Sequence, residues 1–295
     1  MLYQMKPLSG IHILSLSVNL PGPLALARLC QLGATAVKVE PPNGDPLAQA
    51  CPDWYATLID GIQAIKLDLK TTPGRGQLDR YLSQSDLLLT SSRPAAMKRL
   101  GLSWSELSER YPHLLQVAIV GQKPPDENQP GHDLSYQAIY GLVDPPTMPR
   151  SLVADLAGAE QAISAALALL LGRERGINIG KGEDSNEPEL QGRLAIVSLS
   201  EAAASFAQPL KHGLTRSGGL LGGSLPGYNL YQAKDGWVAV AALEQHFLMN
   251  LASSFGLGDL DQAKLARIFL TRPALEWEAW AAERDLPIVA VRRDP

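Results

Sequence analysis

The sequence predicts an α/β protein in which a doubly wound parallel sheet forms a large domain and a small α+β domain follows it. Three observations support this fold class. Strand-like and helix-like segments alternate through the first half of the 295 residues, and prolines and glycines stand at the borders of these segments. Hydrophobic residues make up 45% and charged residues 19% of the chain, as in ordinary globular proteins. Strands separated by helices of this length pair in parallel and are covered by helices on both faces.

Two strands and a helix open the chain. The apolar run 12–17 predicts a buried strand, and 35–40 predicts the next one, which a pair of prolines ends. Between them, the Pro-Gly-Pro sequence at 21–23 opens a helix over 24–31, because proline is favoured in the first helical turn.

Further strands and helices complete the large domain. The strands are expected over 64–69, 86–90 and 114–120, and the helices over 73–83 and 153–171. A polar stretch over 172–192 is expected to form a solvated loop, since glycine and charged residues dominate it.

We place the domain borders where the pattern changes: the large domain at 1–192, a linker at 193–227 and the small α+β domain at 228–295. The linker is expected to be a helix over 193–210 followed by a glycine-rich loop over 217–227. The small domain is expected to have strands at 228–232, 237–243 and 288–291, with helices between the last two.

The charge and the cysteines exclude several classes of protein. A net charge of −4 provides no basic surface for nucleic acid or an anionic membrane. Cys30 and Cys51 are too few for a disulfide framework or an all-cysteine zinc site, which favours a reducing compartment. His246 follows Glu244 by two residues without any metal-ligand spacing, so we expect no metal.

The sequence also indicates a cytoplasmic protein. Residues 1–10 lack the apolar core of a signal peptide. The longest apolar run, 162–171, is too short to cross a bilayer, so we expect no membrane association.

The first strand-to-helix turn argues against a dinucleotide cofactor. It carries only Gly22 and no GxGxxG motif, so NAD binding is disfavoured. A ligand is still expected beyond the carboxyl ends of the strands, near a switch in strand order.

Asp155 stands two residues into the alanine-rich helix, where the helix dipole and free N–H groups favour an ionised carboxylate. It is either a helix cap or a carboxylate nucleophile or base. His132 precedes a segment that is expected to be helical over 134–140, and Asp133 is expected to cap that helix. His132 is therefore either a surface or capping residue or a general acid or base.

Three further groups of residues have both a structural and a functional interpretation. Glu244 follows a strand and is either a first-turn helix residue or a second catalytic carboxylate. Gly222 and Gly223, in the glycine-rich loop, belong either to a lid or to an interdomain linker. The cations that follow the strands can hold phosphates of a nucleotide-like ligand or form a solvated basic face; they are Arg75, Arg93, Lys98 and Arg99.

A series of short motifs runs from residue 6 to residue 291. It includes PGP at 21–23, GDP at 44–46, LDLK at 67–70, RLGL at 99–102, GHDLSYQA at 131–138, VADLAG at 153–158 and GGSLPGY at 222–228. In this order the motifs resemble the class III CoA-transferase family, which includes formyl-CoA and carnitine CoA-transferases and 2-methylacyl-CoA racemase.

The resemblance implies acyl-CoA thioester chemistry. Asp155 matches the family's catalytic aspartate, which attacks the thioester, forms a mixed anhydride and then an aspartyl-CoA thioester. The substrates are then an acyl-CoA and a carboxylic acid acceptor, with coenzyme A as part of the substrate and no separate cofactor. Lys38, at the end of the second strand, joins the four cations above as an expected CoA-binding residue.

Two other hypotheses remain. His132 and Glu244 match residues of the racemase branch, so the alternative activity is a 2-methylacyl-CoA racemase or epimerase that uses His132 and Asp155. The segment 58–65 lacks the basic residues that the family usually carries there, so a non-catalytic CoA-binding protein is the third hypothesis.

The resemblance also implies a Rossmann-like large domain and an interlocked homodimer. In the family the site lies between the large domain of one chain and the small domain of the other, so Glu244 and the Gly222–Gly223 lid would serve the partner's site. Family chains return to the large domain after the small one, and the sequence stops at Pro295, so we expect a shortened C-terminus.

Overall fold

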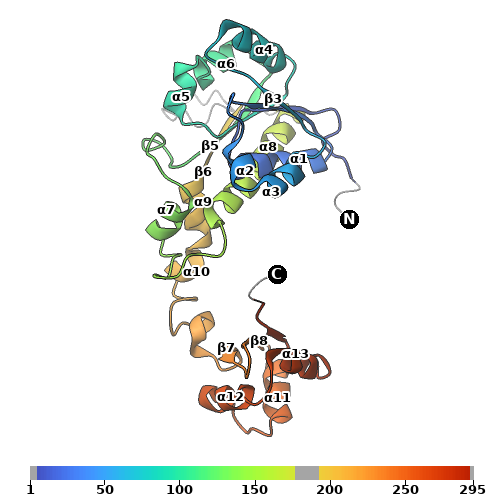
Figure 1. Cartoon of the computed structure of the whole chain (residues 1–295), viewed down its shortest axis with the longest axis vertical. Helices are drawn as coiled ribbons and strands as arrows, with labels where there is room; N and C mark the ends of the chain where they lie inside the picture. Colours follow the sequence, from blue (N-terminus) through green and yellow to red (C-terminus); the bar gives the residue numbers. More distant parts are fainter. Residues whose placement is uncertain (1–4, 177–192, 293–295) are drawn as a thin grey trace. The chain divides into compact units, whose positions relative to one another are not determined.

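The computed structural model describes residues 5–176 and 193–292. The chain forms two compact units, Met1–Ala207 and Gln208–Pro295, each with its own hydrophobic core (Figure 1).

A six-stranded sheet forms the centre of the first unit. Its strands are β1 (His12–Ser15), β2 (Thr35–Glu40), β3 (Gln63–Lys66), β4 (Leu87–Thr90), β5 (Leu115–Val120) and β6 (Leu194–Ser198). They lie in the order β3-β2-β1-β4-β5-β6, and every neighbouring pair is parallel. This order winds outward from β1 and reverses direction at β4, as in doubly wound folds. The predicted α/β class with a parallel sheet is confirmed.

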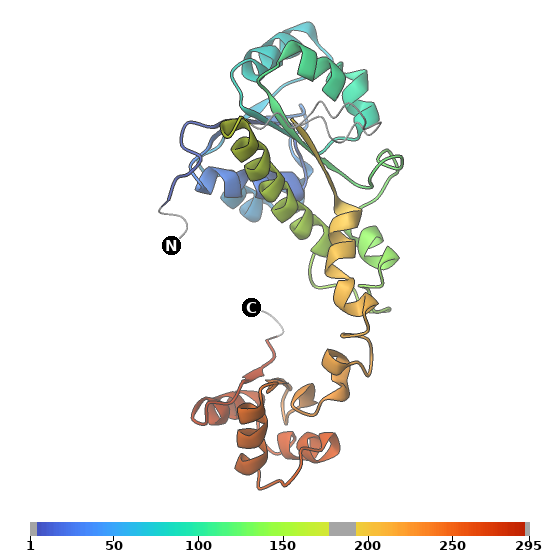
Figure 2. The ribbon, with the colours of Figure 1, turned by 180° about the vertical axis from the view of Figure 1, so that it is seen from behind.

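Helices cover both faces of this sheet (Figures 1 and 2). On one face, α1 (Pro21–Gln31) and α8 (Val153–Glu174) pack on Ile13 of β1 and Leu87 and Leu89 of β4. On the other face, Leu14 and Leu88 contact a second cluster of apolar side chains. Helices α4 (Thr72–Leu82), α5 (Pro94–Arg99) and α6 (Trp104–Arg110) contribute to that cluster. The other helices of this unit are α2 (Pro46–Ala50), α3 (Pro52–Leu58), α7 (Asp133–Ile139) and α9 (Leu199–Phe206), and α10 (Gln208–Lys211) opens the second unit.

Glycine is required where α1 leaves the sheet. A Cβ atom at Gly22 would overlap the side chain of Ser17, so only glycine lets the helix start this close to the strand end. The Pro-Gly-Pro sequence itself forms the first turn of α1, as proline favours.

The expectation of a helix over 193–210 is wrong for its first six residues, whereas α9 and α10 cover most of the remainder. Residues 194–198 instead form β6, which pairs with β5 along its full length, and α9 begins only at Leu199. The β-branched Ile196 and Val197 suit a strand, and pairing with the open edge of β5 outweighs local helix propensity. Residues 193–207 therefore belong to the first unit rather than to a linker. Of the polar stretch expected over 172–192, residues 177–192 lie outside the described part of the chain.

Helix α8 is by length and composition alone long and apolar enough to cross a membrane. Half of its most apolar window is buried inside the structure, where Ala159, Ala162 and Ala166 belong to the core beneath the sheet. We therefore interpret α8 as a core helix.

The second unit is built on a three-stranded antiparallel sheet of β7 (Tyr228–Gln232), β8 (Trp237–Ala241) and β9 (Ile288–Ala290), in that order. Helices α11 (Gln245–Ser254), α12 (Gln262–Phe269) and α13 (Ala274–Ala282) lie between β8 and β9 in the chain. Buried side chains of the strands and of all three helices form one apolar cluster. The indole Nε1 of Trp277 donates to the carbonyl oxygen of Phe269 at 2.8 Å and ties α13 to α12.

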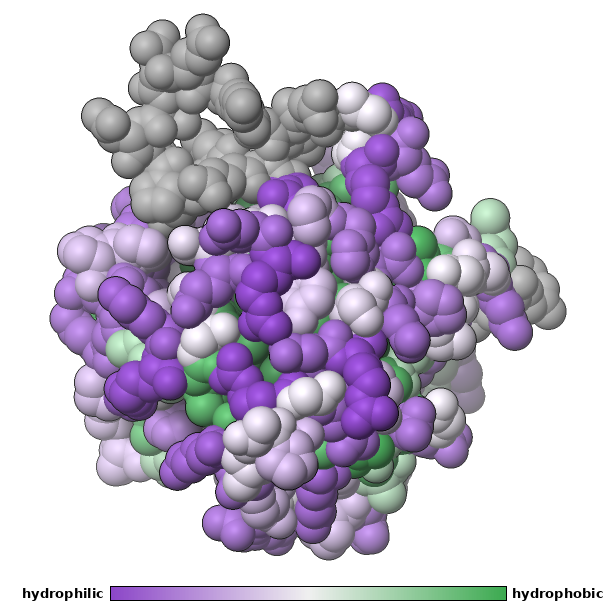
Figure 3. Space-filling view, turned by 90° about the horizontal axis from the view of Figure 1, so that it is seen from above, coloured by the Kyte–Doolittle hydropathy of each residue, from purple (hydrophilic) through white to green (hydrophobic). Residues whose placement is uncertain are grey.

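The surface seen from above in Figure 3 is mainly hydrophilic, with apolar residues visible in small separate areas. Within residues 5–176 and 193–292, no three His, Cys, Asp or Glu side chains gather in a way that could hold a metal ion.

Candidate active site

The segments that follow the strands of the first unit bring polar side chains to one edge of the sheet. Because the strands are parallel, their carboxyl ends meet at this edge, which is where open α/β sheets bind ligands. The winding reverses between β1 and β4, so the segments 16–20 and 91–93 lie at the switch point.

Asp155 is the third residue of α8, at the amino end of the helix. It is not the helix cap, because the N-cap position is Leu152, which offers no side-chain acceptor. The backbone N–H of Asp155 instead donates to Oδ1 of Asp133 at 3.1 Å. Asp133 was expected to cap its own helix. It is in fact the first residue of α7 after the N-cap His132, and its carboxylate satisfies an amide of α8.

Asp133 is held in this position by a neighbour on the same helix. Its side chain is buried, and Oδ2 accepts a hydrogen bond from Nε2 of Gln137 at 2.5 Å. The same amide group of Gln137 donates to the carbonyl oxygen of Ser151 at 2.9 Å, just before α8 begins. The three residues therefore fix α7 against the start of α8.

Burial, and to a smaller extent the negative charge of Asp133, raise the pKa of the Asp155 carboxyl to about 6. At pH 7 about nine tenths of such a group is ionised. The carboxylate is thus more basic than an exposed aspartate yet still charged, which suits a nucleophile or a general base.

A buried tyrosine lies close to this carboxyl. Burial raises the pKa of Tyr136, the charge of Asp155 raises it as well, and the charge of Arg93 lowers it. The ring packs closely against two glycines, since a Cβ atom at Gly121 or Gly131 would collide with it. These glycines precede α7 and follow β5, so the backbone at the sheet edge is shaped around the phenol.

His132 is exposed at the N-cap of α7. Its backbone N–H donates to Oγ of Ser135 at 3.0 Å, and that hydroxyl donates back to the His132 carbonyl oxygen at 2.6 Å. The histidine is next in sequence to Asp133, which contacts Asp155, so the backbone of His132 lies near the amino end of α8.

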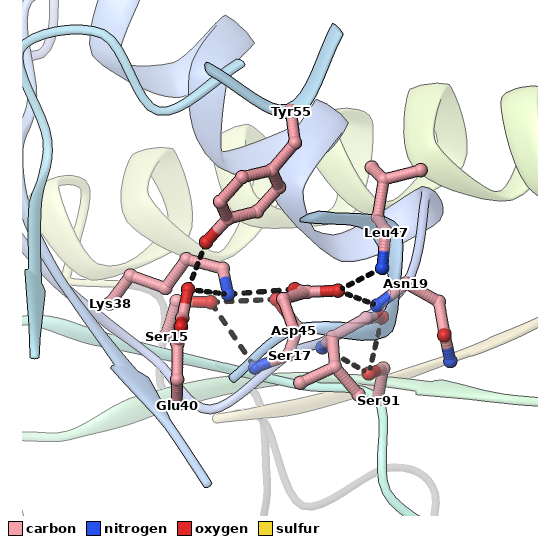
Figure 4. Close-up of polar contacts among 10 residues, drawn as sticks. Ser15, Ser17, Asn19, Lys38, Glu40, Asp45, Leu47, Tyr55 and Ser91 are labelled. Carbon is pink, nitrogen blue, oxygen red and sulfur yellow. Dashed lines mark hydrogen bonds and ion pairs between the residues drawn. The ribbon is translucent and has the colours of Figure 1, made fainter. Parts of the chain in front are cut away.

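A buried ion-pair network joins the loops at the switch point (Figure 4). Nζ of Lys38 lies 2.8 Å from Oδ2 of Asp45 and 3.1 Å from Oε1 of Glu40. The other oxygen of Asp45 accepts hydrogen bonds from the backbone N–H groups of Asn19 at 3.0 Å and Leu47 at 2.9 Å. Lys38 thus holds the carboxylate that joins the β1–α1 turn to the loop after β2.

The Lys38 side chain is fully buried, and its ammonium lies over the ring of Tyr55, whose hydroxyl donates to Glu40. Burial raises the pKa of Glu40, but the hydrogen bonds from Tyr55 and Lys38 outweigh it and the net shift is downward. Glu40 and Asp45 therefore provide two carboxylate partners for the ammonium inside the protein, at a distance from solvent.

One more contact closes the switch point. The hydroxyl of Ser91, just after β4, accepts from the N–H of Val18 at 2.9 Å and donates to its carbonyl oxygen at 3.2 Å (Figure 4). The loops after β1 and β4 are thereby bonded to each other across the reversal in strand order.

The other cations expected to bind CoA occupy the edge of the sheet and the helices beyond it. Arg93 is the exposed N-cap of α5, and Lys98 and Arg99 are exposed in its last turn. Arg75, on α4, reaches the carbonyl oxygen of Gly101 at 3.5 Å and is half-buried.

The remaining sequence-predicted residues belong to the second unit. Gly222 and Gly223 lie in the short helical turn Leu220–Ser224 and interrupt it, and Gly223 has a φ of +98°. Hydrogen bonds at both glycines hold this turn: Gly218 N–H donates to the Gly222 carbonyl oxygen at 2.9 Å, and Asn229 Nδ2 donates to that of Gly223 at 3.0 Å. Glu244 is the exposed N-cap of α11.

Sequence reasoning missed the residues that support Asp155. Gln137 and Tyr136 were not singled out, and Asp133 was expected only as a cap, although all three lie in the GHDLSYQA motif at 131–138. That motif was the available signal; the partner in α8, 22 residues away, could not be identified from it.

Comparisons with known proteins agree over most of the chain. The family model of CoA-transferase family III matches residues 8–294. A succinyl-CoA–D-citramalate CoA-transferase of Chloroflexus aurantiacus is 29% identical, with 86% of this chain and 66% of that protein aligned. The alpha-methylacyl-CoA racemase of Homo sapiens is 26% identical, with 92% and 74% aligned.

Solved structures show the same architecture. The hypothetical protein Rv3272 of Mycobacterium tuberculosis has a TM-score of 0.79 and 25% identity, covering 98% of this chain and 85% of that one.

The chain spans less than two thirds of some curated relatives: it covers 56% of the succinyl-CoA:glutarate CoA-transferase of Homo sapiens, at 27% identity.

Proposed function

The chain belongs to CoA-transferase family III, and on this basis we propose that it transfers coenzyme A from an acyl-CoA thioester to a carboxylic acid, with Asp155 as the nucleophile. The observation that carries the proposal is the Asp155 carboxyl itself, which is largely buried at the amino end of α8 and has its pKa raised to about 6. Its backbone is fixed by Asp133, so the side chain starts from a defined position.

In the proposed reaction the Asp155 carboxyl first carries the donor acyl group, then CoA, and then the acceptor acyl group. The Asp155 carboxylate attacks the thioester carbonyl, the C–S bond breaks, CoA leaves as a thiolate, and the acyl group remains on Asp155 as a mixed anhydride. The thiolate then attacks the aspartyl carbonyl and releases the acyl group as a carboxylate, which leaves an aspartyl-CoA thioester. The acceptor carboxylate repeats these steps in reverse and leaves as the new acyl-CoA.

Charge develops on the carbonyl oxygen in each addition step. The amino end of α8 and the phenol of Tyr136, buried beside Asp155, are the groups we assign to that oxyanion. We assign the CoA phosphates to the exposed cations Arg93, Lys98 and Arg99, with Arg75 behind them. In this proposal Lys38 holds the loops around the ligand rather than contacting a phosphate.

The proposal extends to the second unit and to a second copy of the chain. Glu244 and the turn at Gly222 and Gly223 would complete the site of the partner in a homodimer, with the glycines excluding water from the anhydride. Sedimentation or light scattering of the purified chain tests the dimer directly.

The test of the nucleophile is chemical trapping. Succinyl-CoA is the first donor to use, since two of the relatives are named as succinyl-CoA transferases. Hydroxylamine added during turnover should convert Asp155 to a hydroxamate, which peptide mass spectrometry locates, and Asp155→Asn should form none. Turnover without a modified Asp155 would contradict the mechanism.

A racemase reaction is the second candidate, because α7 places His132 next to the residue that contacts Asp155. The two groups would remove and return the α-proton on opposite faces of a 2-methylacyl-CoA. Incubation in deuterium oxide should then place deuterium at the α-carbon without acyl transfer, and His132→Ala should abolish it. If calorimetry shows no binding of CoA at millimolar concentration, both candidates fail together.

A further inference from the structure

A cavity of about 200 Å³ lies in the first unit on the face of the sheet that α5 and α6 cover. Its floor is the end of β4, the middle of β5 and the strand β6, and its walls come from Met97, Leu102 and Trp104. The loop after β5 closes it through Pro124 and Glu127. The carboxyl ends of β4 and β5 border the cavity, at the same edge of the sheet as the candidate active site.

Two residues that line this cavity each have a buried polar atom without a hydrogen-bond partner in the described residues. One is Oε1 of Gln116, whose residue is 4% exposed, and the other is Oε2 of Glu127. The amide of Gln116 is held from its other end, where Nε2 donates to Oγ1 of Thr90 at 3.2 Å. Buried polar groups in proteins almost always have partners, so these two atoms require one.

The chemistry of the two atoms defines the partner. An amide oxygen and a carboxylate oxygen both accept hydrogen bonds, so the partner has to donate at least two. An ammonium group carries three N–H donors and a charge opposite to that of Glu127. The rest of the cavity wall is largely apolar, which suits a hydrocarbon body attached to that group.

We propose that this cavity is a binding site for a small primary amine with a single-ring apolar body, whose ammonium group bonds to Gln116 and Glu127. The size agrees, because a cavity of about 150 Å³ holds one benzene molecule and the additional volume accommodates an aminomethyl group. The site contains none of the residues assigned to the thioester reaction, and the proposal does not depend on that function.

The position of Glu127 is defined by its neighbours. The side chain of Asn128 accepts a hydrogen bond from the N–H of Ala95 at 2.9 Å, which ties the loop to the start of α5. Gln129 Nε2 donates to Oδ1 of Asp126 at 2.6 Å, a hydrogen bond within the loop that spans Glu127. The carboxylate therefore belongs to a loop that is closed by its own hydrogen bond and tied to α5.

Three probes that share one ring distinguish the contribution of charge to binding from the contribution of ring shape. Benzylamine, benzyl alcohol and phenylacetate are titrated into the full chain at pH 7 and followed by ligand-observed NMR. We expect benzylamine to bind about tenfold or more tightly than benzyl alcohol, as a charge-assisted hydrogen bond implies, and phenylacetate not to bind. Equal affinity for all three, or no binding of benzylamine at millimolar concentration, would overturn the proposal.

Matched variants locate the site. Glu127→Gln and Gln116→Leu should each weaken benzylamine binding about tenfold, while Glu109→Gln, which removes an exposed carboxylate from α6, should leave it unchanged. Glu127 is only half-buried, so its variant should fold even if that of Gln116 does not. A crystal structure in which ordered waters alone bond to Gln116 and Glu127 in saturating benzylamine would also refute the site.

Discussion

Asp133 and Asp155 lie on different helices, and the carboxylate of one accepts the backbone N–H of the other at 3.1 Å. The contact places a second buried negative charge beside the carboxyl that we assign as the nucleophile. One residue therefore fixes both the position and the proton affinity of another, and the two effects are separable by mutation.

Replacement of Asp133 by Asn should shift the pH dependence of the reaction. Asn keeps an oxygen for the Asp155 N–H but removes the charge, so the pKa of Asp155 falls from about 6 towards its ordinary value. The ascending limb of kcat/KM against pH should move to lower pH by roughly half a unit or more. Asp144→Asn, which removes an exposed carboxylate, is the control, and an unchanged profile in both variants would contradict the coupling.

Replacement of Asp155 by Asn should abolish acyl transfer and stabilise the fold at neutral pH. The pKa of Asp155 is raised on folding to about 6, so stability falls as pH rises from the pKa of the unfolded chain to that of the folded chain, and the full cost of the carboxylate is present above about pH 6. The variant should gain about 1–2 kcal/mol at pH 7, and the gain should vanish below pH 4. Urea unfolding at both pH values measures this, and an equal gain at both would contradict it.

Replacement of Lys38 by Met should destabilise the first unit strongly. It leaves the buried carboxylates of Glu40 and Asp45 without their counter-ion, which typically costs about 3–5 kcal/mol. Lys70→Met, at an exposed position, should change stability by less than about 0.5 kcal/mol. Addition of Asp45→Asn to Lys38→Met should recover part of the loss in urea unfolding, because it removes one of the two unpaired charges.

Alanine substitutions at Gly121 and Gly131 should respond differently when Tyr136→Phe removes the phenolic oxygen. Gly121→Ala and Gly131→Ala should each destabilise by about 1–3 kcal/mol, because the added Cβ collides with Tyr136. Tyr136→Phe should rescue Gly121→Ala, where the phenolic oxygen is the main obstacle. It should not rescue Gly131→Ala, where ring carbons lie 2.7 Å away.

Gly76→Ala is the matched control for this pair, since open space surrounds that helical position. It should stabilise α4 by about 0.5–1 kcal/mol. Thermal unfolding of the full set distinguishes collision with the tyrosine from a general effect of alanine.

Strands of the first unit could be predicted from sequence where an apolar run was clearly separated from the neighbouring helical segments. The buried runs at 12–17 and 86–90 became β1 and β4, because fully buried parallel strands are apolar on both faces. The strand β6 could not be predicted in the same way. Its residues run directly into α9, and only pairing with β5 distinguishes the strand from the helix that follows.

Asp155 and His132 could be identified as candidate site residues from sequence, but the residues that support Asp155 and their arrangement could not. Asp155 was identifiable from its place at a helix start and from its motif. Its raised pKa depends on burial and on Asp133, which reaches it through the tertiary packing of α7 on α8. Similarly, Lys38 was expected from sequence to bind CoA, and its burial between Glu40 and Asp45 could not be predicted because it depends on a loop that folds back over the strand end.

The hydroxyl of Ser91 bonds to Val18 across 73 residues of chain and joins the two halves of the sheet where their windings diverge. A molecule that contacts the loops after both β1 and β4 would reinforce that same junction. Ligand affinity and the cooperativity of unfolding are then thermodynamically linked, because separating the halves would also release the ligand. A bound thioester would therefore stabilise the contact between the two halves of the sheet, and ligand binding would raise the melting temperature of the entire first unit.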